Sequence, residues 1–265
     1  MINEVIKELD KLGLKGIHKK VEKNGVIKDG ILIDLGLNIA PTCYLSEFQK
    51  MNYTPEEIAK KIKEQLERTE VPRYDTNEIT TKEYILKHVK PKLVSKVSQN
   101  AIYDDSEFDG IKIIYTVLVQ QNGTETHTYT ITNKILDMSG LTKEEMVKSA
   151  LENNKEDISV ISLAEKLGMF GFGPNGIPPM LIASNKLGVN GAAAILEWKK
   201  ILQDNDIKYA AMIPSSIHEC LICKFDTKEE LEEHFNNVSD LVKLVNTQEL
   251  DPEEWLGEKA YKLIA

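Results

Sequence analysis

Apolar and polar positions form their clearest pattern in residues 180–225, the most apolar and least charged part of the chain. Two apolar runs flank residues 185–191, which contain two glycines and an Asn-Gly pair, and this pattern predicts strand, turn and strand. Apolar residues then recur at helical spacing in 198–202, and two further apolar runs cover 209–213 and 220–225. We therefore expect the central sheet of the protein here.

The N-terminal pattern predicts an amphipathic helix over residues 2–14, because its apolar residues recur on one helical face. Strands at 18–22 and 26–35 flank Asn24-Gly25, a pair typical of a type I′ hairpin. A third strand is expected at 38–48, at an edge or with a bulge because it contains Pro41.

Capping motifs predict where several of the helices begin. Thr54, Thr142 and Thr227 are each followed three residues later by Glu, the pattern of a capping box. The expected helices cover residues 54–68, 81–89, 142 onward, 158–167, 227–245 and 252–263, with a break at Pro91. Strands at 111–120 and 124–131 are expected to pair through Asn122-Gly123.

Hairpins dominate these predictions, so we expect an α+β fold of antiparallel or mixed sheets with helices packed on one face. The three capping boxes also fit three rounds of strands followed by a helix, although such boxes are simply how many helices start. Residues 168–179 hold four glycines and three prolines and cannot be regular structure. We expect a region 1–167, a linker or loop at 168–179 and a region 180–265.

Composition narrows the possible functions. The 265 residues include 33 basic and 42 acidic side chains, a net charge of -9 that repels nucleic-acid backbones overall. The most basic segment, 82–96, is more typical of a solvated helix face than of a nucleic-acid site. No secretory signal or membrane-spanning apolar run is evident, so we expect a soluble, cytoplasmic protein without a cofactor.

Cys220 and Cys223 form a C-x-x-C pair, which in other settings binds zinc or performs redox chemistry. Here the pair lies in a predicted strand, where residues three apart point to opposite faces. The chain has three cysteines and no second C-x-x-C. We expect two buried structural cysteines and no metal.

The one cluster with catalytic residue types follows Pro214 and consists of Ser215, Ser216, His218 and Glu219. Ser216 and His218 share a face of a predicted strand, as a hydroxyl nucleophile and its base would require. However, neighbours on one strand rarely align in that way, and serines after proline often satisfy turn backbone instead. Hydrolase chemistry at this turn is the enzymatic hypothesis.

Several strings occur in order along most of the chain and together are similar to a known family. They are NIAPTCYL at 38–45, PKLV at 91–94, TNK at 132–134, NGAAAIL at 190–196, IPSSIHE at 213–219 and VNT at 245–247. The chain resembles a domain-of-unknown-function family of intracellular proteins common in Gram-positive gut anaerobes. The element order is also faintly similar to a second uncharacterised, bacillus-type family.

The resemblance implies no established activity, cofactor or catalytic residue. It only marks these strings as similar to the family. We take Asn38 and Tyr44 in the 38–45 string, and Asn190 and Gly191 in the 190–196 string, as candidate binding residues. Genes of such families often travel on mobile elements, so a phage–host role is one expectation. We expect a binding or regulatory protein with a protein partner or a second copy of itself, and a hydrolase as the alternative.

Overall fold

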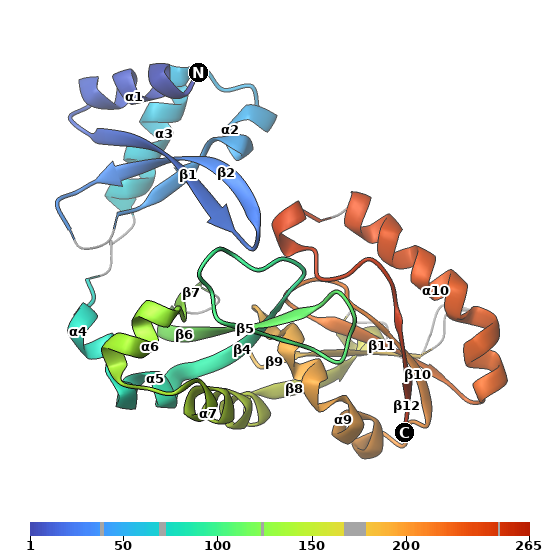
Figure 1. The fold of residues 1–265 in the computed structure, drawn as a ribbon. Coiled ribbons are helices and arrows are strands. Elements are labelled where there is room, and N and C mark those ends of the chain that lie inside the picture. The colour runs from blue at the N-terminus through green and yellow to red at the C-terminus, as the bar shows by residue number, and fades with distance from the viewer. Residues whose placement is uncertain (38–39, 69–72, 123–124, 167–178, 249) are drawn as a thin grey trace. The chain divides into compact units, whose positions relative to one another are not determined.

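The computed structural model describes residues 1–37, 40–68, 73–122, 125–166, 179–248 and 250–265. These residues divide into two compact units, Met1–Ile79 (unit 1) and Thr80–Ala265 (unit 2), and each is described by itself. Helices combine with three antiparallel sheets, so the α+β prediction is confirmed (Figure 1). Apart from Pro179, the expected linker or loop at 168–179 lies outside the described residues.

Unit 1 contains a three-stranded sheet, and the helices that contribute to its core pack on one face of that sheet. Its elements are α1 (Ile2–Lys11), β1 (Lys15–Lys23), β2 (Val26–Asp34), β3 (Thr42–Tyr44), α2 (Leu45–Lys50), α3 (Pro55–Arg68) and α4 (Thr76–Ile79). The hairpin is confirmed, since Asn24 and Gly25 both have positive φ, 48° and 74°, as a type I′ turn requires. The strand order is β1-β2-β3.

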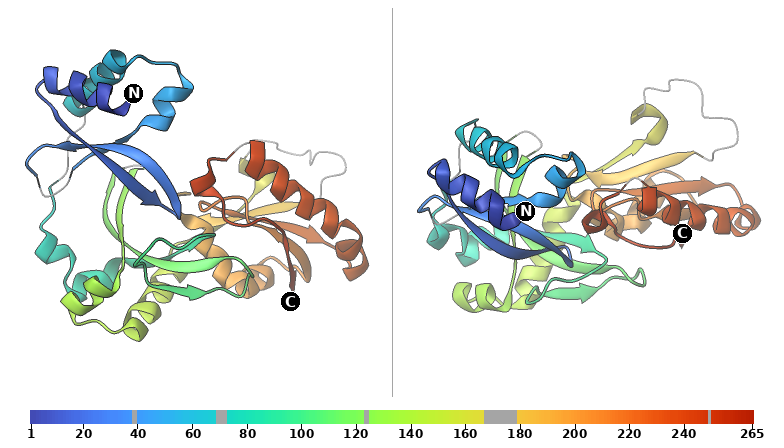
Figure 2. Two further views of the ribbon diagram at one scale, coloured as in Figure 1. Left: turned by 45° about the horizontal axis from the view of Figure 1, so that its top comes forward. Right: turned by 90° about the horizontal axis from the view of Figure 1, so that it is seen from above.

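The core of unit 1 lies between this sheet and helices α1 and α3 (Figure 2). Val5 and Leu9 of α1 and Ile58 of α3 are fully buried against Ile31 and Ile33 of β2. Because successive strand residues point to opposite faces, the residues between them in β2 form the other face of the sheet. The helices of unit 1 therefore pack on one face of its sheet, over the end around Ile31 and Ile33, whereas Ile27 farther along the same face is 69% exposed.

The prediction of a single strand over 38–48 was wrong beyond Tyr44, where the chain turns into helix α2. Leu45 is buried in the core of unit 1 and Phe48 packs against that core one helical turn later. This spacing of three residues is helical, and burial of both side chains favours a helix over an extended edge strand.

Unit 2 contains a four-stranded sheet near its start. The elements are α5 (Lys82–His88), β4 (Val89–Val94), β5 (Tyr103–Asp105), β6 (Lys112–Asn122), β7 (Glu125–Thr130), α6 (Asn133–Ser139) and α7 (Lys143–Lys155). Strand β6 pairs with β4, β5 and β7. Pro91 does not end a helix but lies in β4, an edge strand that tolerates a missing N–H donor.

A five-stranded sheet, in the order β12-β10-β11-β9-β8, makes up the rest of unit 2. Its strands and associated helices are β8 (Ile158–Ser162), α8 (Leu163–Lys166), β9 (Met180–Asn185), the 3-10 helix η1 (Gly191–Glu197), α9 (Trp198–Asp204), β10 (Tyr209–Ile213), β11 (Cys220–Phe225), α10 (Lys228–Gln248), the 3-10 helix η2 (Pro252–Glu254) and β12 (Tyr261–Ile264). This is the central sheet that the apolar runs predicted.

Both faces of this sheet are covered. Met212 and Ile222 pack with η1 and α9 on one face, whereas Ala211 and Phe225 pack with α10 on the other. Figure 1 shows α9 and α10 on opposite sides of strands β10 and β11. The expected one-sided packing thus describes unit 1 and not this sheet.

Three predictions in this region were wrong. Residues 158–162 form strand β8 rather than a helix, because they pair with β9 along their whole length. The apolar run after the 185–191 turn was expected to be a strand but forms the 3-10 helix η1. Its consecutive small residues Ala192–Ala194 are buried against the sheet. The helix expected at 252–263 is instead the short 3-10 helix η2, followed by strand β12. In β12 the buried Leu263 lies between two exposed residues, which is the two-residue period of a strand.

The capping motif marks a helix start in all three places. The Oγ of Thr54 accepts the N–H of Glu57 at 3.3 Å, that of Thr142 accepts Glu145 at 3.2 Å, and that of Thr227 accepts Glu230 at 3.1 Å. The sheets that precede these helices differ in strand number and order. The motif is therefore explained as helix capping, without a repeated unit.

Candidate functional site

The predicted catalytic turn, residues 214–219, joins β10 to β11. The Oγ of Ser216 accepts the N–H of His218 at 3.0 Å, and the N–H of Ser216 donates to the carbonyl of Glu219 at 3.1 Å. Ser216 is only 6% exposed. Its hydroxyl oxygen thus helps to close the turn, the ordinary role of a serine hydroxyl that bonds nearby backbone.

Both ring nitrogens of His218 face protein groups. Nδ1 accepts the backbone N–H of Asn190 at 3.0 Å, and Nε2 lies 3.5 Å from Oε1 of Glu254. Because Nδ1 accepts a hydrogen bond, a neutral ring carries its proton on Nε2, directed at the Glu254 carboxylate. The imidazole therefore links the 214–219 turn to two other segments of unit 2.

The structure brings the four predicted catalytic residues into one turn but does not align them with one another. The imidazole of His218 contacts Asn190 and Glu254, while Oε2 of Glu219 accepts a hydrogen bond from Nζ of Lys166 at 2.9 Å. Ser215 donates its backbone N–H to Ile213 at 2.9 Å. A hydrolase needs its nucleophile, base and orienting group in one chain of hydrogen bonds. Catalysis by these residues stays a hypothesis.

Asn190 and Gly191, two of the predicted binding residues, dock directly on this turn. The carbonyl of His218 accepts both the N–H of Gly191 at 3.0 Å and the Oγ of Ser184 at 2.8 Å. A Cβ added to Gly191 would lie 2.4 Å from the Ser184 Oγ and from the backbone N of Asn185. The chain at residue 191 can approach the end of β9 this closely only because that residue is glycine.

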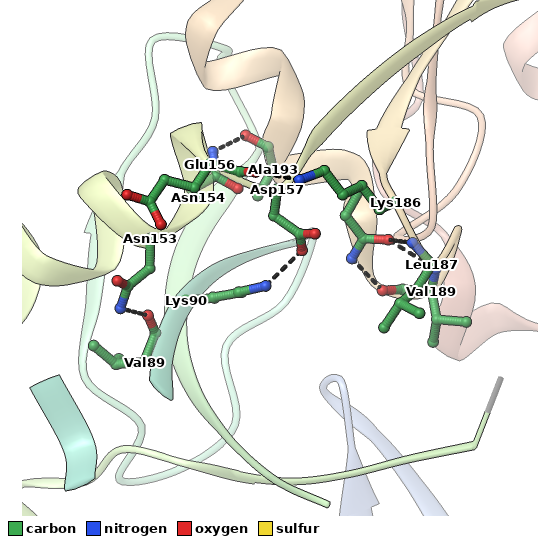
Figure 3. A network of polar contacts seen from close by, with 11 residues as sticks. Val89, Lys90, Asn153, Asn154, Glu156, Asp157, Lys186, Leu187, Val189 and Ala193 are labelled. Carbon is green, nitrogen blue, oxygen red and sulfur yellow. Dashed lines mark hydrogen bonds and ion pairs between the residues drawn. The ribbon is translucent and has the colours of Figure 1, made fainter. Parts of the chain in front are cut away.

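Asn190 and Gly191 also line a small cavity of about 50 Å³. Its other walls include His88, Lys90 and Asp157, and Nζ of Lys90 lies 2.5 Å from Oδ2 of Asp157 (Figure 3). Burial and the neighbouring lysines Lys87 and Lys90 lower the pKa of His88 below its ordinary value. A cavity of this size holds a few waters or one small polar group.

Backbone and side-chain contacts hold the wall of this cavity around Asp157 (Figure 3). The carbonyl of Asp157 accepts the N–H of Lys186 at 3.0 Å, and Nζ of Lys186 donates to the carbonyl of Glu156 at 2.7 Å. Nδ2 of Asn154, which is 7% exposed, donates to the carbonyl of Ala193 at 3.0 Å. These contacts join α7 and the residues after it to the residue after β9 and to η1.

Tyr44, a further predicted binding residue, lies on β3 of unit 1. Its register partner is Gly30, which places the ring on the face of the sheet opposite the core residues Ile31 and Ile33. The ammonium groups of Lys23 and Lys28 lie 5.8 Å and 5.5 Å from the ring centroid, within the range of cation–π contacts. The fourth binding residue, Asn38, lies outside the described residues.

Cys220 and Cys223 point to opposite faces of β11 and pack in different hydrophobic clusters, as predicted. Burial raises the pKa of both thiols, that of Cys223 to about 11 with a contribution from Glu230. Both are therefore protonated at neutral pH and poor nucleophiles. Among the described residues, no group of three or more His, Cys, Asp or Glu side chains is placed to bind a metal ion.

In a comparison with known families, the sequence model of DUF5688, a family of unknown function, matches residues 2–263. The chain belongs to this family. The resemblance to a family of unknown function is thereby confirmed. No curated protein and no solved structure matched. Within the part of this DUF5688 chain that the structure describes, no helix has the length and apolar character to cross a membrane.

Sequence reasoning missed several residues that this DUF5688 structure brings to the site. Glu254 and Asp157 carry no motif and lie far along the chain from their partners His218 and Lys90. Lys90 belongs to the basic segment 82–96, but there Lys90 pairs with Asp157 and Lys82 with Glu145 at 2.7 Å. No sequence motif predicts these ion pairs, because their partners come together only through strand pairing and helix packing.

Proposed function

We propose that this protein is a binding protein that acts through a protein partner, and that the outer face of the unit 1 sheet makes the contact. The outer face consists of the strand residues that point away from α1 and α3. The observation that carries the proposal is that the helices of unit 1 leave this face uncovered, although it combines apolar, aromatic and basic side chains.

The register of the strands gives the membership of this face. Its members are Lys15, Ile17, Lys19, Val21 and Lys23 of β1, Val26, Lys28, Gly30, Leu32 and Asp34 of β2, and Thr42 and Tyr44 of β3. Ile17 is 43% exposed. A solvent-facing strand position usually carries a polar residue, so an isoleucine beside a tyrosine and lysines is typical of a contact surface.

Charge favours an acidic protein surface as the partner. The outer face carries four lysines and one aspartate, Asp34, which pairs with Lys15 at 2.7 Å. The whole chain has a net charge of -9, so this face is a positive patch on an acidic protein. Such complementarity speeds encounter and selects the partner. The overall negative charge opposes a nucleic-acid backbone, and a symmetric second copy would set lysines against lysines.

Site-specific cross-linking tests the proposal in the full chain. A photo-reactive amino acid placed at Ile17 should capture one protein at defined stoichiometry in lysate of the source cells, and mass spectrometry would identify it. The matched control places the same group at Met51, which is 67% exposed and outside the three strands. Equal capture from both positions would contradict the proposal.

A charge-reversal variant provides the second part of the cross-linking experiment. Lys19→Glu should abolish capture from Ile17, because it reverses the charge at the centre of the outer face. Lys7→Glu on exposed α1 makes the same charge change away from this face and should leave capture intact. Loss of the captured species on nuclease treatment, or a cross-linked homodimer by native mass, would overturn the protein-partner proposal. The captured protein would also show whether a phage–host process is involved.

The hydrolase alternative rests on the 214–219 turn. Its support is the proximity of His218 to Glu254, and its weakness is that a backbone N–H occupies the other ring nitrogen. Turnover of an ester or amide panel that is lost in both Ser216→Ala and His218→Ala, with folding intact by circular dichroism, would favour the enzyme. Unchanged background turnover in both variants favours the binding protein.

A further inference from the structure

Unit 2 contains a larger cavity, of about 360 Å³, that shares no lining residue with the cavity beside Asn190. Three segments form it: the residues after β4, the turn before β6, and the chain from η2 to β12. The side chains that matter for its chemistry are Ser95, Lys96, Asp109, Trp255, Glu258 and Tyr261. Its volume is in the range of small-molecule sites, roughly 300–1,000 Å³.

Hydrogen bonds hold the frame of this cavity. Oγ of Ser95 donates to the carbonyl of Trp255 at 2.8 Å, and the hydroxyl of Tyr261 donates to the carbonyl of Asp109. Nδ2 of the buried Asn246 donates to the carbonyl of Gly257 at 2.7 Å. A Cβ on Gly257 would lie 2.8 Å from Cγ of Pro214, so this wall packs tightly against the β10–β11 turn. The cavity is therefore formed before any ligand arrives.

Two half-buried aromatic side chains, Trp255 and Tyr261, line the cavity together with Pro252. Phe108 packs edge-on against Tyr261, with ring centroids 5.3 Å apart, and so restricts that ring. Flat apolar surfaces of this kind favour a ligand with an aromatic ring, because ring pairs gain stability beyond the buried area.

The charges around the cavity define the rest of the ligand. Asp109 and Lys259 neutralise one another through a 2.8 Å ion pair. Lys96 and Glu258, both on the solvent-exposed rim, also line the cavity, and neither forms a hydrogen bond or ion pair with another residue in the described part of the chain. One cation and one anion without partners are matched by a ligand that carries one charge of each sign.

We propose that this cavity binds a free aromatic amino acid, with the ring against Trp255 and Tyr261, the α-carboxylate on Lys96 and the α-ammonium on Glu258. A zwitterion satisfies both charges at once, whereas an anion or a cation alone leaves one of them unmatched. The site lies wholly within unit 2, so it stands independently of the partner surface on unit 1.

Fluorine NMR of the full chain labelled with 5-fluorotryptophan tests this directly, because the protein has two tryptophans, Trp198 and Trp255. Titration with L-phenylalanine should shift the Trp255 resonance saturably and leave that of Trp198 in place. Trp198→Phe assigns the two signals. Absence of a saturable shift at millimolar L-phenylalanine, or an equal shift of both signals, would overturn the proposal.

Charge-deleted ligands and variants make the test specific. Phenethylamine, which lacks the carboxylate, and 3-phenylpropionate, which lacks the ammonium, should each bind about ten-fold or more weakly than phenylalanine. Lys96→Ala should remove the preference over phenethylamine, and Glu258→Gln the preference over 3-phenylpropionate. Lys208→Ala and Glu229→Gln, both exposed and outside the cavity, are the matched controls. Preferences that survive Lys96→Ala and Glu258→Gln would contradict the assignment.

Discussion

The sheet of unit 1 and the five-stranded sheet of unit 2 are buried in different ways. Helices cover one face of the first and both faces of the second. The strand sequences reflect this difference: β1 reads KGIHKKVEK, whereas β10 and β11 read YAAMI and CLICKF. A strand with one open face can carry charges, but a strand covered on both faces cannot do so without cost.

The difference also separates two uses of polar groups. At the 214–219 turn of unit 2, polar atoms of Ser216 and His218 bond other protein groups and hold segments together. On the outer face of unit 1, Lys19 and its neighbours are displayed on regular strands. Rigid internal bonding is typical of scaffold, and displayed charge is typical of recognition.

The variants with the largest expected effect on stability are a matched pair of core truncations, one in each unit. Leu9→Ala in unit 1 and Ile222→Ala in unit 2 each remove a fully buried side chain, and each should lower the free energy of unfolding of its own unit by about 2–5 kcal/mol. Hydrogen exchange read by mass spectrometry on peptides from β2 and β11 separates the two effects.

Tryptophan fluorescence gives an independent readout, because Trp198 and Trp255 both lie in unit 2. Leu9→Ala should leave the denaturant midpoint of this signal in place, and Ile222→Ala should lower it. An equal shift of both peptides and of the fluorescence midpoint by Leu9→Ala would show that the chain unfolds as one cooperative body, and the division into units would fail as an energetic description.

A second pair of variants, both Gly→Ala, tests two glycines at which neighbouring atoms approach closely. Gly191→Ala in unit 2 places a Cβ 2.4 Å from the backbone N of Asn185, whereas Gly30→Ala in unit 1 meets the side-chain Cγ2 of Thr42 at 2.7 Å on the outer face. A side chain facing solvent can rotate away, but backbone cannot. We expect losses of about 3 kcal/mol for Gly191→Ala and about 1 kcal/mol for Gly30→Ala, measured by denaturant titration. Equal losses would mean that the outer face is as tightly packed as unit 2.

How far the sequence predicts this fold depends on how local each signal is. Capping by Thr54 and Thr142 and the Asn24-Gly25 turn are decided within a few residues, and all were predicted correctly. Residues 158–162 and 261–264 become strands only because β9 and β10 offer edges to pair with. The pattern along the chain does not contain that information.

The candidate site shows the same limit. His218 and Asn190 were singled out from separate strings, and the structure joins them by a hydrogen bond that no spacing predicts. Glu254, Asp157 and the Trp255 cavity arise where distant segments meet, so they were not predicted. Residue type suggested chemistry at the 214–219 turn, whereas only the structure shows which partner each polar atom has.

Helix caps give a smaller effect of equal size in both units. Thr54→Ala and Thr142→Ala each remove the hydroxyl that accepts the N–H of a glutamate at the third helical position. Each should lower the stability of its own unit by about 1 kcal/mol, read by hydrogen exchange on peptides from α3 and α7. Thr→Ser at the same positions keeps the hydroxyl and serves as the control. A serine variant as unstable as alanine would show that packing of the threonine methyl matters instead.

Alkaline pH should weaken unit 2 slightly. Burial and the nearby Asp109 carboxylate raise the pKa of Tyr261 to about 12. A group whose pKa is raised by folding stabilises the fold below its unfolded pKa, about 10, and that stability is lost as pH rises toward 12. Tyr261→Phe should flatten this part of the fluorescence-detected stability profile. An unchanged profile would show that other groups cause the alkaline loss.

The smallest stability effect is expected where the proposed functional effect is largest. Ile17→Thr keeps a β-branched residue at an exposed strand position, so the free energy of unfolding of unit 1 should change by less than about 0.5 kcal/mol. The same variant removes the main apolar contact from the outer face and should weaken partner capture from a photo-reactive group at Val21. If Ile17→Thr destabilised unit 1 strongly, the isoleucine would belong to the core and the face would not be open. If capture were unaffected in a stable variant, the apolar part of the surface would be dispensable and the lysines alone would select the partner.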